Sequence, residues 1–173
     1  SPLWIFGYAS LVWRPEPSWE GFETKRGYVD GWSRWFAQRS MDHRGTPDAP
    51  GLVCTMLPDA TGSTLGTAYL VPDDRADDVL ATLDFREKGG YSRDVVPGRL
   101  DDDSVVQALV YSATAENPNF VKDFVSTDPA ALDAAASIIA TSIGPSGPND
   151  EYLLRLADVC PDDGYLQQLK LRV

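Results

Sequence analysis

Short runs of apolar residues, each bounded by turn residues, dominate the chain up to residue 71 and predict strands. The run at residues 3–6 meets its first glycine too early for a helix, so we expect a short buried strand there. Residues 25–39 alternate only in part and are rich in aromatic side chains, which predicts one or two strands broken near Asp30-Gly31. Further strands are expected over four ranges: 51–57, 65–71, 92–96 and 105–112.

Helical periodicity first appears after residue 72. Acidic residues directly after Pro72 are typical of a helix start, and we expect a helix from about Asp74 to Lys88 that ends at Gly89-Gly90. Four apolar residues at helical spacing form its expected buried face: Ala76, Val79, Leu80 and Leu83. Three more helices are expected later: from Pro129 to about Ser142, from a cap at Asn149 or Asp150 to Asp158, and over residues 165–171.

Glu87 is placed on the apolar side of the first helix. It follows Leu80 by seven residues and Leu83 by four, so its carboxylate shares their face. Burial, together with the negative end of the helix dipole, raises the pKa of a carboxyl group, which suits a general base near neutral pH. The alternatives are a Glu87 that turns to solvent at the last helical turn, or one that pairs with Arg86 or Arg93.

A loop of small residues follows the first strand. Small side chains let a ligand approach the backbone, and consecutive turn amides can form a concave site for an anion. The alternative reading of residues 7–11 is an ordinary turn after a strand.

Length and charge limit the classes of function. A chain of 173 residues without repeats or linkers predicts one domain over residues 1–173. Its 15 basic and 26 acidic residues give a net charge of −11, which suits neither nucleic acid nor an anionic membrane. An anionic small-molecule substrate would need a local basic or amide-lined pocket.

Membrane insertion and secretion are not indicated by the hydropathy pattern. No apolar run approaches about 18 residues, so no membrane span is expected. The given sequence does not begin with a basic segment followed by an apolar one, so no signal peptide is visible, and we expect a cytoplasmic protein.

The cysteines and the histidine indicate no metal or redox site. Cys54 and Cys160 are far apart in sequence and are interpreted as buried reduced thiols, with a long-range disulfide as the alternative. His43 is the single histidine, which excludes a histidine-rich zinc site and leaves little basis for Ser-His-Asp catalysis.

Four sequence blocks, taken together and in their order along the chain, resemble segments of a known family. They are residues 6–15 (Phe-Gly-Tyr-Ala-Ser-Leu-Val-Trp-Arg-Pro), 42–47 (Asp-His-Arg-Gly-Thr-Pro), 86–91 (Arg-Glu-Lys-Gly-Gly-Tyr) and 146–153 (Ser-Gly-Pro-Asn-Asp-Glu-Tyr-Leu). They resemble the F-G-Y-G-S-L-[IV]-W-x-P, D-H-R-G, R-E-x-x-G-Y and S-G-x-N-x-E-Y-L segments of the ChaC-type, glutathione-specific γ-glutamylcyclotransferases. The resemblance implies an α+β protein with the γ-glutamylcyclotransferase-like fold, a small mixed β-barrel flanked by helices, and no cofactor.

The resemblance also implies roles for particular residues. Glu87 matches the family's catalytic glutamate, and the loop that holds the γ-glutamyl head matches Tyr8, Ala9, Ser10 and Leu11. Tyr91 and Tyr152 are candidates to line the pocket, with plain packing as the alternative. Arg44 either binds a substrate carboxylate or forms a local ion pair beside Asp42. Asn149 is interpreted as a helix cap.

Ala9 departs from the family pattern, which has glycine at this position. Glycine adopts positive φ freely and alanine does not, so Ala9 is expected at negative φ.

The chemistry implied for such a protein needs no metal and no enzyme nucleophile. The α-amine of a γ-glutamyl peptide attacks its own γ-carbonyl, which converts glutathione into 5-oxoproline and Cys-Gly. Two alternatives stay open: a cyclotransferase for other γ-glutamyl amines, and a γ-glutamyl-binding protein with weak turnover. A glycosidase is disfavoured, because only one inward acid is evident and that chemistry usually needs two.

Overall fold

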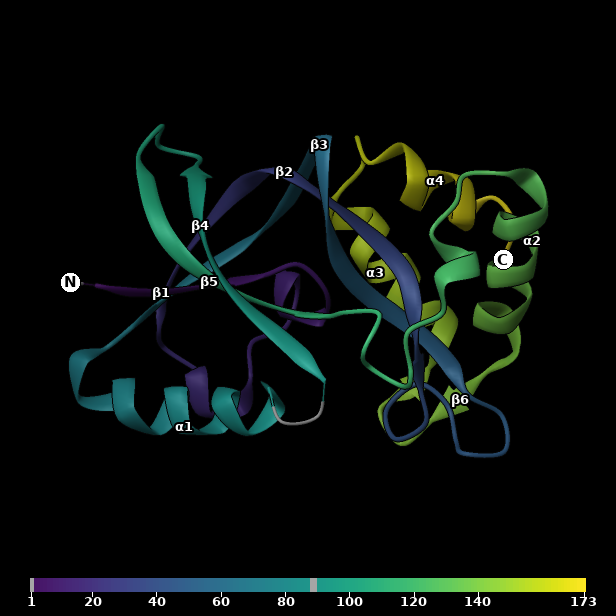
Figure 1. Cartoon of the computed structure of the whole chain (residues 1–173), viewed down its shortest axis with the longest axis horizontal. Coiled ribbons are helices and arrows are strands. Elements are labelled where there is room, and N and C mark those ends of the chain that lie inside the picture. Colours follow the sequence, from purple (N-terminus) through teal and green to yellow (C-terminus); the bar gives the residue numbers. More distant parts are fainter. Residues whose placement is uncertain (1, 88–89) are drawn as a thin grey trace. The chain divides into compact units, whose positions relative to one another are not determined.

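The computed structural model describes residues 2–87 and 90–173, the side chains of Arg86 and Glu87 excepted (Figure 1). The chain forms two compact units, one of Ser1–Arg34 with Met56–Pro118 and one of Trp35–Thr55 with Asn119–Val173. Each unit is described by itself below, and the single domain expected from the sequence stays a prediction.

Five strands form a closed mixed β-barrel, most of which belongs to the first unit, while residues 35–40 and 51–55 belong to the second. Its strands are β1 (Leu3–Gly7), β2 (Glu23–Ser40), β3 (Gly51–Val71), β4 (Tyr91–Leu100) and β5 (Val105–Ala113), in the order β1-β3-β2-β4-β5. β1 pairs antiparallel with β3, Phe6 opposite Ala68, and parallel with β5, Ile5 opposite Leu109, and this second pairing closes the barrel. The predicted α+β barrel is therefore confirmed.

β2 and β3 are single long strands of 18 and 21 residues. The prediction of separate strands over 51–57 and 65–71 is wrong, because β3 continues through the polar residues between them. Two contacts with Trp32 keep this part of β3 against β2. The Thr64 hydroxyl donates to the Trp32 carbonyl over 2.9 Å, and a Cβ at Gly62 would lie 2.5 Å from the same oxygen. Gly31 adopts φ +84° and lies inside β2, which does not break there.

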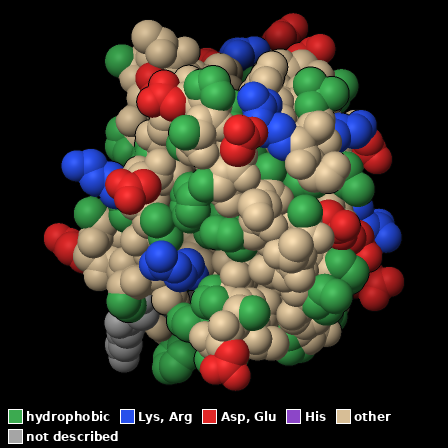
Figure 2. Space-filling model, turned by 90° about the vertical axis from the view of Figure 1, so that its right-hand side faces the viewer, with side chains coloured by type: hydrophobic (Ala, Val, Ile, Leu, Met, Phe, Trp, Pro, Cys, Tyr) green, Lys and Arg blue, Asp and Glu red, His purple; other side chains and the backbone are tan. Residues whose placement is uncertain are grey.

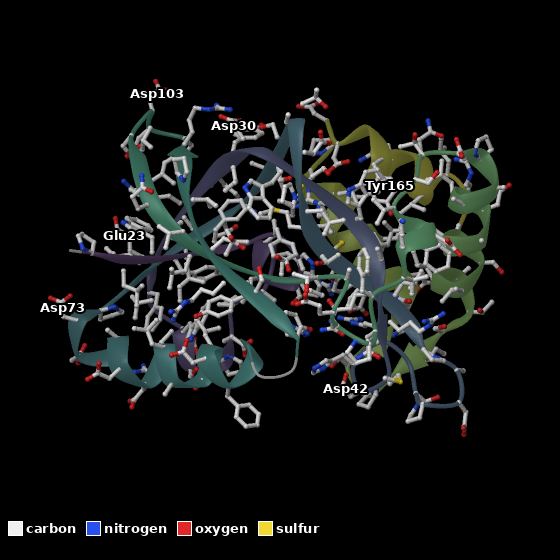
Figure 3. All side chains as sticks on the ribbon, viewed as in Figure 1. Glu23, Asp30, Asp42, Asp73, Asp103 and Tyr165 are labelled. Carbon is white, nitrogen blue, oxygen red and sulfur yellow. The ribbon has the colours of Figure 1, made fainter. Side chains whose placement is uncertain are left out.

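Helix α1 (Ala76–Glu87) follows a 3₁₀ turn at Asp73–Arg75, and Asp73 marks the start of this segment in Figure 3. Val79 and Leu83 are buried in a cluster that includes Ile5, Trp19, Tyr69 and Val71, with Ala76 packed against it. The predicted buried face of this helix is thus confirmed for its central residues. Gly89, its expected end, lies outside the described residues, and Gly90 forms a turn at φ +96°.

Helices form most of the second unit. They are α2 (Pro129–Thr141), α3 (Asn149–Val159) and α4 (Gly164–Lys170), and a two-stranded hairpin of β6 (Ile143–Gly144) and β7 (Gly147–Pro148) joins α2 to α3. The three predicted C-terminal helices are confirmed. Their apolar faces supply the core of this unit: Leu132, Ile139, Leu153, Leu156, Leu166 and Leu169.

Tyr165 of α4 is half-buried in this unit and is labelled in Figure 3. Its hydroxyl accepts a hydrogen bond from the Phe36 amide over 2.9 Å, and its ring packs edge-on against Trp35 at a centroid distance of 4.8 Å. Burial raises the pKa of the Tyr165 hydroxyl, so it stays protonated and can serve as a fixed polar contact.

The structure corrects the prediction that Asn149 caps a helix. Pro148 occupies the N-cap position of α3, and Asn149 is the first helical residue, fully buried. Its side chain binds the backbone of Leu52 instead of its own helix, because the amide has both a donor and an acceptor to offer a strand residue.

Basic and acidic side chains are interspersed over the face of the molecule shown in Figure 2. None of the helices within residues 2–87 and 90–173 is both long and apolar enough to cross a membrane.

Candidate functional site

The loop after β1 is held in place by hydrogen bonds to its backbone carbonyl groups. Residues 10–12 form a 3₁₀ turn, and every carbonyl from Tyr8 to Val12 accepts a hydrogen bond from the first unit. The donors are Arg34 Nη1 to Tyr8 (2.9 Å), the Val12 amide to Ala9 (3.0 Å), the Arg14 amide to Ser10 (2.8 Å), the Tyr69 hydroxyl to Leu11 and Arg26 Nη1 to Val12 (2.8 Å). Burial raises the pKa of the Tyr69 hydroxyl, which keeps its proton available for this bond.

The amide groups of the same loop face away from these donors. A trans peptide points its N–H opposite to its C=O, and none of the described peptide bonds is cis. Within the part of the chain that the structure describes, the amides of Ala9, Ser10 and Leu11 donate to no protein acceptor. Three adjacent donors are thus left for a ligand.

Ala9 has φ −120°, so the expectation of negative φ is confirmed. The loop turns back sharply at Gly7, where a Cβ would lie 2.4 Å from the Cβ of Leu11. The close approach therefore needs glycine at position 7 and not at position 9.

The side chain of Tyr8 connects the loop to β5 and to α1. Its hydroxyl donates to the Tyr111 carbonyl over 2.8 Å, and the Tyr111 hydroxyl donates to Asp84 over 3.4 Å. Asp84 also pairs with Arg93 of β4 at 2.8 Å. Packing also holds the last turns of α1 near the loop. Leu11 of the loop packs against the apolar cluster that contains Leu83 of α1.

Glu87 is the last residue of α1. Its side chain lies outside the described residues, so its orientation toward the apolar stripe stays a prediction. Two neighbours constrain its backbone: Leu83, four residues earlier, is buried, and Asp84, three residues earlier, carries the bonds described above. Asp84 is one partner of Arg93.

Tyr91 begins β4, opposite Ala113 of β5, and is half-buried in the first unit. Gly90 precedes it with positive φ, and a Cβ there would lie 3.0 Å from the Cα of Asn117. Gly90 is thus packed against the segment after β5. Whether the Tyr91 hydroxyl lines a pocket stays a prediction.

Arg44 and Tyr152 lie together in the second unit. Arg44 is 2 % exposed, donates to the Pro148 carbonyl over 2.9 Å, lies 3.6 Å from a carboxylate oxygen of Glu151 and places its guanidinium 5.6 Å from the Tyr152 ring centroid. The Tyr152 hydroxyl accepts a hydrogen bond from the Cys54 amide. These contacts bring the 42–47 and 146–153 blocks together.

The structure thus groups the predicted site residues by unit. Tyr8, Ala9, Ser10, Leu11 and Tyr91 belong to the first unit, as does the backbone of Glu87, whereas Arg44 and Tyr152 belong to the second. The residues that fasten the loop were not predicted: Arg26, Arg34, Tyr69 and Tyr111. One of these residues could have been noticed in the sequence, because Arg34 is a basic residue inside a strand rich in aromatic side chains.

Cys54 and Cys160 are buried and are not joined in a disulfide, as the interpretation as reduced thiols expects. Among the described residues, no three His, Cys, Asp or Glu side chains are grouped so that they could hold a metal ion.

Comparison with known proteins defines the family. The ChaC-like protein family matches residues 3–170, and the chain belongs to this family. It is 42 % identical over 160 residues to human glutathione-specific γ-glutamylcyclotransferase 1, covering 90 % of this chain and 68 % of that protein. It is 36 % identical over 172 residues to the glutathione-specific γ-glutamylcyclotransferase of Schizosaccharomyces pombe, covering 90 % and 81 %.

A solved structure shows the same architecture. The crystal structure of a yeast γ-glutamyl cyclotransferase specific to glutathione superimposes with a TM-score of 0.83 at 28 % identity, covering 100 % of this chain and 96 % of that one. The family and fold expected from the four sequence blocks are therefore confirmed.

Proposed function

We propose that the chain is a γ-glutamylcyclotransferase that converts glutathione into 5-oxoproline and Cys-Gly. The observation that carries this proposal is its similarity, over nearly the whole chain, to proteins named glutathione-specific γ-glutamylcyclotransferases. The loop with three available amides supports it, because a γ-glutamyl head group presents a carboxylate and a carbonyl oxygen that need such donors.

The reaction is an intramolecular acyl transfer. The α-amine attacks the γ-carbonyl carbon and forms the C–N bond of a five-membered lactam, the bond to the cysteinyl nitrogen breaks, and that nitrogen leaves with a proton as the amine of Cys-Gly. Because the nucleophile is tethered to the electrophile, the enzyme's task is to orient them and move protons.

Glu87 is the proposed proton carrier. It removes a proton from the α-ammonium group and returns it to the leaving nitrogen, so one carboxylate serves both steps. Support comes from its place at the C-terminal end of α1, one turn beyond Leu83, which shares a cluster with Leu11 of the loop. The dipole of α1 disfavours the ionised carboxylate there and favours a base with a raised pKa.

The loop is the proposed holder of the γ-glutamyl head. The amides of Ala9, Ser10 and Leu11 bind its α-carboxylate and stabilise the oxyanion that develops on the γ-carbonyl, and Tyr8 positions the loop through Tyr111. Tyr91 is proposed to line the same pocket. Arg44 and Tyr152 stay predicted substrate-binding residues, and their described contacts support a structural role in the second unit.

The proposed compartment is the cytoplasm. Cys54 and Cys160 form no disulfide with each other, which is the state that a reducing compartment maintains. Fractionation of cells that express the tagged chain tests this proposal.

Incubation of the purified protein with reduced glutathione, read by mass spectrometry, tests the activity. The expected products are equimolar 5-oxoproline and Cys-Gly, absent from the Glu87→Gln control. Unchanged glutathione after prolonged incubation with the folded parent would refute the proposal.

A further inference from the structure

We propose that Arg34 is a positioning residue for the substrate head group, acting through the Tyr8–Ala9 peptide to give the loop its preference for an anion. This inference rests on the proposed function of the loop and assigns a role to a residue outside the four sequence blocks that define the family resemblance.

Arg34 is a buried cation that contacts the loop. It is 4 % exposed, and its Nη1 donates to the Tyr8 carbonyl over 2.9 Å and to the Leu65 carbonyl of β3 over 2.8 Å. A guanidinium stays protonated in proteins, and burial reduces the screening of its charge by solvent. The neighbouring backbone is tightly packed, since a Cβ at Gly66 would lie 2.3 Å from the Gly7 carbonyl oxygen.

The bond to Tyr8 polarises a peptide whose amide is available. The Tyr8 carbonyl and the Ala9 amide belong to one peptide group, and a cation on the oxygen draws charge through it, so the Ala9 N–H becomes a stronger donor. A carboxylate bound to that amide would lie roughly 8 Å from the guanidinium, where an effective dielectric constant of about 20 still leaves a substantial attraction. In a chain of net charge −11, such a local cation offsets the unfavourable field on an anionic substrate.

Arg26 provides a comparison within the same loop. Its Nη1 donates to the Val12 carbonyl over 2.8 Å and to the Thr67 hydroxyl over 2.9 Å, so it also fastens the loop with a cation. The amide of the Val12–Trp13 peptide, however, already donates to the Ser10 carbonyl. Arg26 therefore polarises an amide that is not available to a ligand, whereas Arg34 polarises one that is.

The test compares Arg34→Gln with Arg26→Gln. Isothermal titration measures the dissociation constants of 5-oxoproline, which carries the carboxylate, and of its neutral carboxamide. For Arg34→Gln we expect the preference for the anion over the carboxamide to fall about thirtyfold, the order expected for losing one unit charge at this range. Arg26→Gln also removes a charge near the loop but depolarises no available amide, so we expect its preference for the anion to stay within about threefold of the parent's.

A conservative variant separates charge from shape. Arg34→Lys keeps the positive charge, so its preference for the anion should stay within about threefold of the parent's. This variant decides the question even if Arg34→Gln fails to fold, because a lysine variant without the preference would overturn the proposal. Equal loss of affinity for both ligands in Arg34→Gln would likewise overturn it.

The outcomes distinguish this inference from the proposed function. A folded parent that produces no 5-oxoproline from glutathione refutes the proposed function. An active parent whose anion preference is unchanged in Arg34→Gln refutes only the role of Arg34.

Discussion

The side-chain amide of Asn149 binds both backbone groups of Leu52. The Leu52 amide donates to Asn149 Oδ1 over 2.7 Å, and Asn149 Nδ2 donates to the Leu52 carbonyl over 2.8 Å. Both residues are fully buried. The Asn149 side chain thus pairs both backbone hydrogen-bonding groups of Leu52, as a neighbouring strand would. These bonds connect the start of α3 to the start of β3.

Asn149→Asp should destabilise the protein strongly. Aspartate keeps the size and one acceptor but loses the donor, so the Leu52 carbonyl is left unpaired beside a second oxygen. We expect the free energy of unfolding to fall by about 2–4 kcal/mol, measured by denaturant titration. The control is Asp150→Ala in the same helical turn, expected to cost about 0.3–1 kcal/mol through the helix dipole. Equal effects of the two variants would contradict this account.

Glu87→Gln should fold normally and lose turnover. Glutamine has nearly the same shape, so packing survives while proton transfer does not, and a general base typically contributes about 10²–10⁴-fold. The comparison measures kcat with glutathione and the thermal midpoint of each variant. Asp77→Asn, at an exposed position in the first turn of α1, is the matched control and should keep parental kcat. Glu87 has no part in the mechanism if its glutamine variant stays within a few-fold of the parent.

Ala9→Gly should lower stability slightly and leave the kinetics nearly unchanged. Because Ala9 has a negative φ of −120°, glycine is not needed there for positive φ, and its main expected effect is to add freedom to the unfolded chain. The expected loss is about 0.4–1 kcal/mol in the free energy of unfolding, with KM for glutathione within about twofold of the parent's, because the loop's hydrogen bonds come from the backbone and other side chains. A variant that is clearly more stable than the parent would count against this reading.

A glutathione derivative acetylated on the γ-glutamyl α-amine should be inert. The amide nitrogen of the derivative is not nucleophilic, so ring closure cannot start even where the derivative binds. Product analysis by mass spectrometry, with glutathione and the S-methylated peptide as controls, checks this. Release of Cys-Gly from the acetylated peptide would show that another nucleophile attacks.

The sequence patterns predicted the elements well where the signal was local. The strand at residues 3–6 and helix α1 follow from apolar spacing and turn residues, and both occur as expected. The four blocks predicted the family, because order and spacing over the whole chain carry more information than any one block.

Long-range relationships were not predictable from the same patterns. β3 continues through a polar stretch that reads as a break, because contacts with Trp32 hold it there. Asn149 reads as a cap after a Gly-Pro segment, but its partner Leu52 lies 97 residues away. The role of Arg34 depends on the Tyr8 carbonyl, 26 residues away, which no local periodicity reveals.

The most direct test of the central claim is the reaction of glutathione in water enriched in ¹⁸O. Intramolecular attack by the α-amine consumes no water, so the account predicts unlabelled 5-oxoproline together with Cys-Gly. Attack by water would place ¹⁸O in the γ-carboxylate of free glutamate, and this labelled product would contradict the account.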